Sequence, residues 1–469
     1  MSRETRMAVL DRLLLHLSHG GRYVIPRHAC PSTEDYASLA ADVIRMGAVG
    51  LGLPGSEPQS PREGALARCV GEVAVGVDHL ALTKVGTHYL RVVEADASRT
   101  LASRSRRSRV QDIVRLPAQA FTALGKTTSH GVSHSVAGIE PTFEVPAMTL
   151  RRYEGDITLV GSCLALLESS VMPESFRHNH ESTLRNPRLV AVDREFATVS
   201  DRDIATRHLP GSYYHLDASN SGHFGHLTTE VVSKLWGWDE AKSRCPDLKA
   251  FFRLRHPNER IPELEMRLFQ AYGIDRRDVV WAGEPVRVDE LYGASPLWHN
   301  QFPHFVSPRI VEIWDRMAGH LVRHQAEDPE RVFVSRHDTT SSNRRCRNRH
   351  DVESYFEGRG FTVIYPEHLD LVEQATIFAG AKVVAGFAGS ALFNLMYSRR
   401  LEKAIVLAHE GYTARNEHLY GAVLGFDVDY VWSSPDIAHP EGGWTEAAYF
   451  SDWEFDFRRN KKTLEALVP

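Results

Sequence analysis

The stretch from Arg331 to Asn394 constrains the fold of this chain most, because strand and helix patterns alternate along it. Apolar and β-branched runs at 331–335, 361–365 and 381–385 indicate buried strands, and 369–379 has helical spacing. The last run leads directly into Gly386-Phe-Ala-Gly-Ser-Ala-Leu-Phe-Asn394. A strand that enters a helix through a glycine turn leaves unpaired N–H groups at the positive end of the helix dipole. The stretch therefore predicts an α/β sheet with a phosphate site at this turn.

Similar alternation extends to both sides of this stretch. Strand patterns at 156–160, 189–192, 212–216, 249–254 and 278–281 are interleaved with helix patterns at 221–236 and 261–272, which predicts parallel βαβ units in a domain over 151–305. Strands near 332, 363, 383, 405 and 431 predict an open, doubly wound sheet in a domain over 306–440.

The two ends of the chain have other patterns. Residues 1–116 should form a small α+β portion, with helices at 4–17 and 34–46 and an antiparallel sheet within 72–94. The basic cluster 103–109 has no interleaved aromatic residues, so we interpret it as a solvated loop rather than a phosphate or nucleic-acid contact, and 127–146 as more of that loop. The aromatic tail 441–469 should pack back on the first domains.

Composition limits the classes of function. The 469 residues exceed what one hydrophobic core fills, and a net charge of −5 gives no reason to expect nucleic acid as a partner. Five scattered cysteines without C-x-x-C spacing are typical of a reduced, cytoplasmic protein. The longest nearly apolar run, 157–167, is too short to span a bilayer. We expect a cytoplasmic protein without a transmembrane segment, which could visit a membrane only peripherally.

Several spaced motifs resemble one family of enzymes. The family motif G-x-H-G-A-G-L-T-N is matched by Gly386, Gly389, Leu392 and Asn394, and a P-E-x-L-x-x-x-E-Q segment by Pro366, Glu367, Leu369, Glu373 and Gln374. A strand-ending Ser-Arg is matched by Ser335 and Arg336, an acidic helix start by His350, Asp351 and Glu353, and Y-Y-H-W-x-x-E-x-x-P by Phe224, His226 and Glu230. On these motifs, residues 212–432 resemble glycosyltransferase family 61. Ala388, Ala391 and Phe393 depart from its histidine, glycine and threonine.

The resemblance implies a GT-B-like fold, in which two Rossmann-type parallel-sheet domains face a cleft. It also implies transfer of a hexosyl or pentosyl group from a nucleotide-diphosphate sugar, with inversion by single displacement. A UDP-sugar is the expected donor, a glycan, protein or small molecule the acceptor, and no metal or other cofactor is required.

Donor binding can be assigned residue by residue. Backbone N–H groups of Gly389, Ser390 and Ala391 would stabilise the departing diphosphate. Arg336, with one of Arg344, Arg345 or Arg347, would clamp the same oxygens, although these arginines could equally be a solvated loop. We assign Arg345 to this role. Glu373 would bind the ribose, or else only begin a helix, and the donor set is completed by Gln374, Gly386 and Asn394.

The acceptor hydroxyl needs a base. His226 and Glu230 form an i, i+4 pair, in which the carboxylate would orient an imidazole acting as general base; a purely structural pair is the alternative. Asp217, after a strand, is the reserve candidate. His223, His226 and Glu230 could also bind a metal in a hydrolase, and Asp427-Val-Asp429 mimics the D-x-D of metal-using transferases. A catalytically inactive scaffold or sugar-binding protein is the third possibility.

Overall fold

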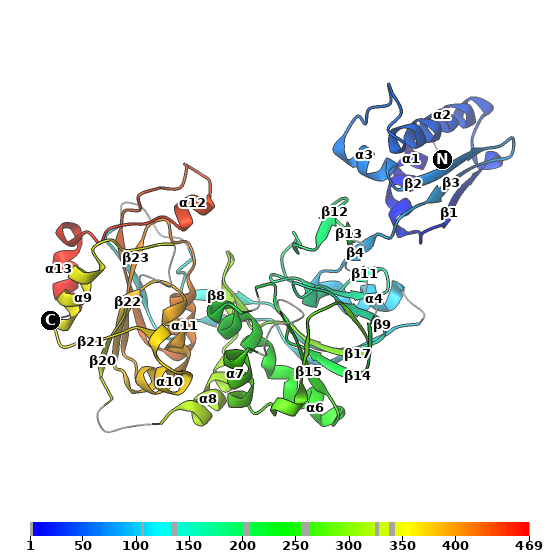
Figure 1. Ribbon diagram of the computed structural model, residues 1–469. Coiled ribbons are helices and arrows are strands. Elements are labelled where there is room, and N and C mark those ends of the chain that lie inside the picture. The colour runs from blue at the N-terminus through cyan, green and yellow to red at the C-terminus, as the bar shows by residue number, and fades with distance from the viewer. Residues whose placement is uncertain are drawn as a thin grey trace. The chain divides into compact units, whose positions relative to one another are not determined.

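The computed structural model describes residues 3–104, 107–132, 138–199, 207–220, 222–254, 262–323, 328–336 and 343–468. It is a mixed α/β structure with parallel and antiparallel sheets, as the sequence predicts (Figure 1). The chain divides into two compact units. Unit 1 comprises Met1–Gln111, Arg152–Gly211 and Glu284–Leu291, and unit 2 comprises Asp112–Arg151, Ser212–Gly283 and Tyr292–Pro469.

The N-terminal part of unit 1 contains the predicted helices and small sheet. Helices α1 (Arg3–Leu13), α2 (Thr33–Gly50) and α3 (Pro61–Ala67) accompany an antiparallel sheet in the order β1 (Arg22–Pro26), β3 (His79–Lys84) and β2 (Val70–Val75). Ser32 begins α2 by accepting a hydrogen bond from the Asp35 N–H at 3.0 Å, which satisfies one unpaired donor of the first turn.

The remainder of unit 1 is antiparallel for the most part, so our prediction of parallel βαβ units from residue 151 onward is wrong for this stretch. Strands β9 (Met148–Leu159), β10 (Ala165–Leu167) and β11 (Ser170–Val171) pair antiparallel, as do β12 (Leu189–Ala191), β13 (Phe196–Val199) and β4 (Tyr89–Arg91). The connections from β9 to β10, from β10 to β11 and from β12 to β13 are too short for the crossover that parallel neighbours need. Unit 1 also contains α4 (Ala97–Arg104), while β5 (Arg109–Leu116) and β17 (Val286–Ala294) belong partly to each unit.

The last three strands in the order of the eleven-stranded sheet confirm the predicted βαβ pattern. Strands β14 (Arg207–His215), β15 (Lys249–Arg253) and β16 (Val279–Ala282) pair parallel over 213–215, 249–253 and 279–282. A helical segment connects the first two; it comprises α5 (Phe224–His226), the π-helix η6 (Leu227–Val231), the 3₁₀ helix η7 (Val232–Gly237) and α6 (Trp238–Arg244). Helix α7 (Glu263–Tyr272) connects the next two strands and packs against α8 (Ile310–Leu321).

The six-stranded sheet of unit 2 consists of parallel strands, and its last five in chain order are the predicted ones. The spatial order is β21 (Thr362–Ile364), β20 (Arg331–Val334), β22 (Val383–Phe387), β23 (Lys403–His409), β24 (Asp427–Ser433) and β7 (Thr127–His130). From β20 the chain passes to β21 on one side of that strand, and then crosses to β22 on the other side. This reversal between β20 and β22 is a topological switch point, where open α/β sheets bind their ligands.

Alternate residues of these strands enter two hydrophobic cores, so both faces of the six-stranded sheet are covered. Val332, Val384 and Val406 pack with α8, α10 (Leu371–Gly380) and α11 (Asn416–Leu424). Phe333 and Leu407 pack on the opposite face with α9 (Arg349–Glu357) and α13 (Phe457–Leu467). A strand buried on both faces needs the continuous apolar run that the sequence shows.

Two segments differ from the sequence-based expectation. Residues 127–146, expected to be loop, contain β7 and β8 (Thr142–Val145), which pairs with β6 (Gln119–Thr122). Strand β7 is polar and is held by contacts with the neighbouring strand β24. One of them is a hydrogen bond from the Trp432 indole N–H to Ser129 Oγ at 3.2 Å. The tail, expected on the first domains, instead contacts the six-stranded sheet: Trp453, Phe455 and Leu464 pack with Phe387. Unit 2 is completed by β18 (Trp298–His299), β19 (Phe305–Val306) and α12 (Glu446–Tyr449).

Candidate functional site

The predicted motifs meet at the carboxyl ends of β20 and β22, on either side of the switch point. Ser335 and Arg336 follow β20, and Ala388 and Gly389 follow β22. The Arg336 guanidinium reaches across and donates through Nη2 to the Ala388 carbonyl. Because this place is where a doubly wound sheet binds its ligand, the Ser-Arg motif and the glycine turn belong to one site.

Gly389 has two reasons to be glycine. Its φ of 137° and ψ of −170° place it where residues with a side chain are strained. A Cβ atom at this position would lie 1.9 Å from Arg336 Nη2, so the guanidinium occupies the space of the missing side chain. Gly386 is also confined, since a Cβ there would lie 2.7 Å from the Val334 carbonyl oxygen. The motif glycines thus let β20 and the turn approach each other.

Only part of the predicted set of amide donors remains available for an anion. The Gly389 N–H donates to the buried carboxylate of Glu417 at 3.1 Å, so it is already used inside the protein. The next residues, Ser390 and Ala391, begin the 3₁₀ helix η10 (Ser390–Tyr397). Among the described residues their N–H groups have no acceptor, as expected for the first turn of a helix. These two amides are the members of the predicted donor set that stay available for an anion.

Arg344, rather than Arg345, is the second arginine at the turn. Its Nη2 atom lies 3.5 Å from the position of a Cβ on Gly389. Burial and the charge of Arg344 lower the pKa of Arg336 to about 10, which leaves the Arg336 guanidinium charged at neutral pH. Arg345 instead pairs with Asp452 at 3.2 Å and is 59% exposed, and Arg347 pairs with Asp436. The structure therefore brings two cations together, and Arg345 is not one of them.

A buried hydrogen-bond network fixes the end of β20 and hence the backbone of Arg336. Glu353, in α9, accepts hydrogen bonds from Ser335 Oγ at 2.5 Å and from the Tyr365 hydroxyl at 2.9 Å. Arg349 lies 3.4 Å from the same carboxylate and donates to the Arg336 carbonyl. The motif residues Ser335 and Glu353 thus help to fix the backbone from which the Arg336 side chain extends.

The Glu-Gln motif has a structural role at the beginning of α10. Glu373 forms a capping box with Asp370, accepting from the Asp370 N–H at 2.7 Å. Gln374 accepts from Asn394 Nδ2 at 2.8 Å and donates to the carbonyls of Pro366 and Leu369. Gln374 and Asn394 therefore join α10 to η10. The ribose contact expected of Glu373 stays a prediction.

The predicted base lies beside the glycine turn, although its motif is far away in the sequence. His226 Nδ1 is 2.6 Å from Glu230 Oε1, and the π-helix η6 begins directly after this histidine. A Cβ on the preceding Gly225 would lie 3.1 Å from Ser390 Cβ and 2.9 Å from the Phe393 ring. Close packing at Gly225 therefore places the residue before His226 against the helix η10 that follows the glycine turn.

Asp217, the reserve base, lies deeper in the protein. It follows β14 and is 1% exposed; its Oδ1 accepts from the Ala218 N–H at 3.0 Å, and its carbonyl accepts from Lys234 Nζ at 2.7 Å. His226, with 23% of its side chain exposed, is the more accessible of the two candidates.

The alternative metal sites find no support in the geometry. Within the described ranges, His223, His226 and Glu230 do not bring three ligand atoms within reach of one ion. Asp429 pairs with His130 at 2.7 Å, and Asp427 accepts from the Lys126 N–H at 2.9 Å. Both aspartates of the D-x-D sequence thus hold β7 and its approach against β24.

Sequence reasoning missed two buried groups at this edge of the sheet. Glu417 accepts from the Tyr430 hydroxyl at 3.0 Å as well as from Gly389, and burial raises its pKa. His409 ends β23, and burial with the nearby charge of Arg344 lowers its pKa to about 4, so its imidazole is neutral. Neither residue belongs to a spaced motif, so the sequence offered no signal for them.

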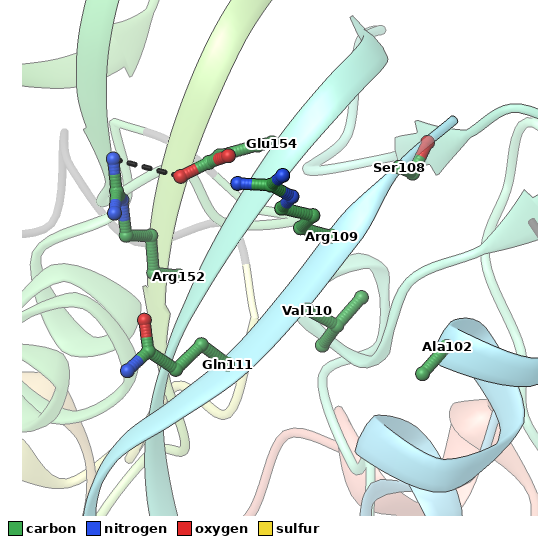
Figure 2. Close-up of a pocket in the computed structure, with 7 residues that line it drawn as sticks. All are labelled: Ala102, Ser108, Arg109, Val110, Gln111, Arg152 and Glu154. Atoms are coloured by element: carbon green, nitrogen blue, oxygen red, sulfur yellow. Dashed lines mark ion pairs between the residues drawn. The ribbon is translucent and has the colours of Figure 1, made fainter. Parts of the chain in front are cut away.

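The basic cluster 103–109 borders a cavity in unit 1; residues 105 and 106 lie outside the described part of the chain. The cavity measures about 400 Å³ and is lined by Ala102, Ser108, Arg109, Val110, Gln111, Arg152 and Glu154. Figure 2 shows the Arg152 guanidinium paired with Glu154, at 2.8 Å, and Glu290 lies 2.9 Å from the same arginine. Two carboxylates therefore offset the charge of Arg152 at this cavity, which Arg109 also lines.

Comparison with known proteins agrees with the motif assignment. None of the curated proteins compared with the chain matches it. In the described part of the chain, no helix combines the length and apolar character required to cross a membrane. The sequence model of the family described as Glycosyltransferase 61 matches residues 224–405, which contain His226 and Glu230, the Ser-Arg motif and the glycine turn. Residues 224–405 are thus similar to Glycosyltransferase 61, as the motifs indicated, and that family implies glycosyltransferase activity.

Proposed function

We propose that unit 2 transfers a hexosyl or pentosyl group from a nucleoside-diphosphate sugar to an acceptor hydroxyl, by single displacement with inversion. One observation carries the proposal. The guanidinium groups of Arg336 and Arg344 and the amides of Ser390 and Ala391 converge at a switch point. Two fixed cations and two fixed N–H donors complement a departing diphosphate, whose charge grows as the glycosidic bond breaks.

His226 is proposed as the base for the acceptor. A carboxylate can only accept a hydrogen bond, so Glu230 holds a proton on His226 Nδ1, and Nε2 is the ring nitrogen that would accept the proton of the acceptor hydroxyl. Nε2 then takes the proton of the acceptor hydroxyl as its oxygen bonds to the anomeric carbon. The bond from that carbon to the diphosphate oxygen breaks, and the electron pair stays on the diphosphate.

The two guanidinium groups can supply the charge that a divalent cation would bring to a diphosphate, so the proposed reaction requires no metal. In this proposal the six-stranded sheet is the donor side of a GT-B-like arrangement. The parallel strands β14 to β16, with their helical segment, are the acceptor side. A glycan, a protein or a small molecule could supply the hydroxyl.

The test is mass-spectrometric screening of UDP-, GDP- and dTDP-sugars with the full chain, with and without chelator. We expect one donor, with a UDP-sugar first, to be consumed equally in both conditions, faster when an acceptor mixture is present. Binding of a donor without turnover would support the inactive scaffold instead. Absence of both binding and consumption would overturn the proposal.

A further inference from the structure

Trp444 is a large aromatic side chain held in an exposed position near the candidate donor site. It is 58% exposed and lies in the tail segment between His439 and α12. That segment is fixed at both ends: the Thr445 N–H donates to His439 Nδ1 at 3.1 Å, and His439 Nε2 lies 3.0 Å from the Gly411 carbonyl oxygen. The hydrogen bond to Nδ1 places the ring proton on Nε2, so both contacts are satisfied by neutral histidine. The exposed indole is therefore carried by an ordered turn.

Ring contacts connect Trp444 to the glycine turn at Gly389. The Trp444 ring lies 6.2 Å from His439 and 5.9 Å from Tyr449, and Tyr449 stacks on Tyr412 at 5.8 Å. The Arg344 guanidinium lies 5.2 Å from the Tyr449 ring and 5.3 Å from the Tyr412 ring. One tyrosine and one arginine thus separate the exposed indole from Gly389.

We infer that Trp444 stacks on the nucleobase of the donor, an inference that rests on the proposed function. A nucleobase is tied through its ribose to the diphosphate, so it must lie close to whatever holds the phosphates. Arg344 contacts both the turn and the aromatic stack, which places a flat apolar surface at that position. Base stacking on an aromatic ring tolerates different bases, because every base has a π face.

Trp444 lies outside residues 224–405, the segment similar to the family. The proposed stacking surface therefore lies in the tail, outside the segment that is similar to the family. An acceptor sugar ring would be the other flat partner for an exposed indole. The experiment separates the two partners.

The experiment compares inorganic pyrophosphate with UDP by calorimetry, in the wild-type chain and in Trp444→Ala, Trp444→Phe and Leu124→Ala. Leu124 is 67% exposed in unit 2 and precedes β7 at the amino ends of the parallel strands, beside Gly425, so it controls for loss of exposed apolar surface. We expect Trp444→Ala to weaken UDP binding about tenfold and to leave pyrophosphate binding unchanged. Trp444→Phe should restore most of the loss, and Leu124→Ala should change neither.

Other outcomes overturn the inference, and they differ from failure of the proposed function. If the wild-type chain binds neither pyrophosphate nor UDP, both fail. If UDP binds more tightly than pyrophosphate and Trp444→Ala leaves both affinities unchanged, the stacking role alone fails. Equal loss of both ligands would show that Trp444 only supports the turn, and an effect confined to the acceptor KM would assign the indole to the acceptor.

Discussion

The replacement Gly389→Ala tests the geometry of the glycine turn directly. Gly389 has a φ of 137°, a conformation that costs an alanine about 1–3 kcal/mol. The new Cβ would also start 1.9 Å from Arg336 Nη2, whereas 3.4 Å is an ordinary contact, so the guanidinium must retreat by about 1.5 Å. The first cost lowers the free energy of unfolding, and the second removes a cation from its ligand.

The two effects have separate magnitudes and separate assays. Loss of one hydrogen bond to a charged group costs about 1.5–3 kcal/mol, so pyrophosphate affinity should fall at least about tenfold in calorimetry. The free energy of unfolding, from urea titration, should fall by about 1–3 kcal/mol. Gly360→Ala is the matched control, because Gly360 has a φ of 77° and nothing within 4 Å of its Cβ position. It should lose stability and keep its pyrophosphate affinity.

A double-mutant cycle tests whether the Arg336 guanidinium contacts the ligand. With Arg336→Ala, the collision disappears, so adding Gly389→Ala should reduce pyrophosphate affinity little further. Arg336→Ala alone should weaken binding while the protein stays folded. If Gly389→Ala binds pyrophosphate as well as the wild-type chain, or if the two losses simply add, the proposed contact between Arg336 and the ligand is refuted.

Three further predictions address the base, the buried histidines and the helix cap. His226→Ala should reduce turnover by about 10²–10⁴-fold with pyrophosphate affinity unchanged, and Glu230→Gln should shift the pH profile of turnover; a fully active His226→Ala would remove this base. Burial lowers the pKa of both His409 and His418 to about 4, so between pH 6.5 and 4 the unfolded chain binds more protons than the folded one. Stability should therefore fall by about 1 kcal/mol per pH unit per histidine as pH drops through this window, measured by urea unfolding; His418→Gln should flatten the slope, and an unchanged slope would contradict the assignment. Glu373→Ala should lower the free energy of unfolding by about 1 kcal/mol through loss of the capping box, and a loss of UDP affinity in the same variant would add the ribose contact.

Local pattern was sufficient for the parts of the fold that depend on local physics. Continuous apolar runs mark strands buried on both faces, and β20 to β24 were predicted because both faces of their sheet are covered. Strand β7 was missed because Thr127-Thr-Ser-His130 has no apolar pattern and pairs only through contacts supplied by β24. The antiparallel pairing in unit 1 was missed because a strand pattern does not specify the direction of its neighbour.

The glycine turn, the Ser-Arg pair and the i, i+4 relation of His226 to Glu230 could be predicted from the amino-acid sequence, because each depends on the spacing of residues close in the chain. Long-range packing was needed to establish that Arg344 and not Arg345 faces the turn, that Glu417 accepts the Gly389 N–H, and that Gly225 packs on Ser390. Adjacent arginines have the same charge and composition, so which of them contacts an anion depends on the direction of each side chain. That direction is set by residues distant in the chain, among them the aromatic tail around Arg344 and the Asp452 that pairs with Arg345.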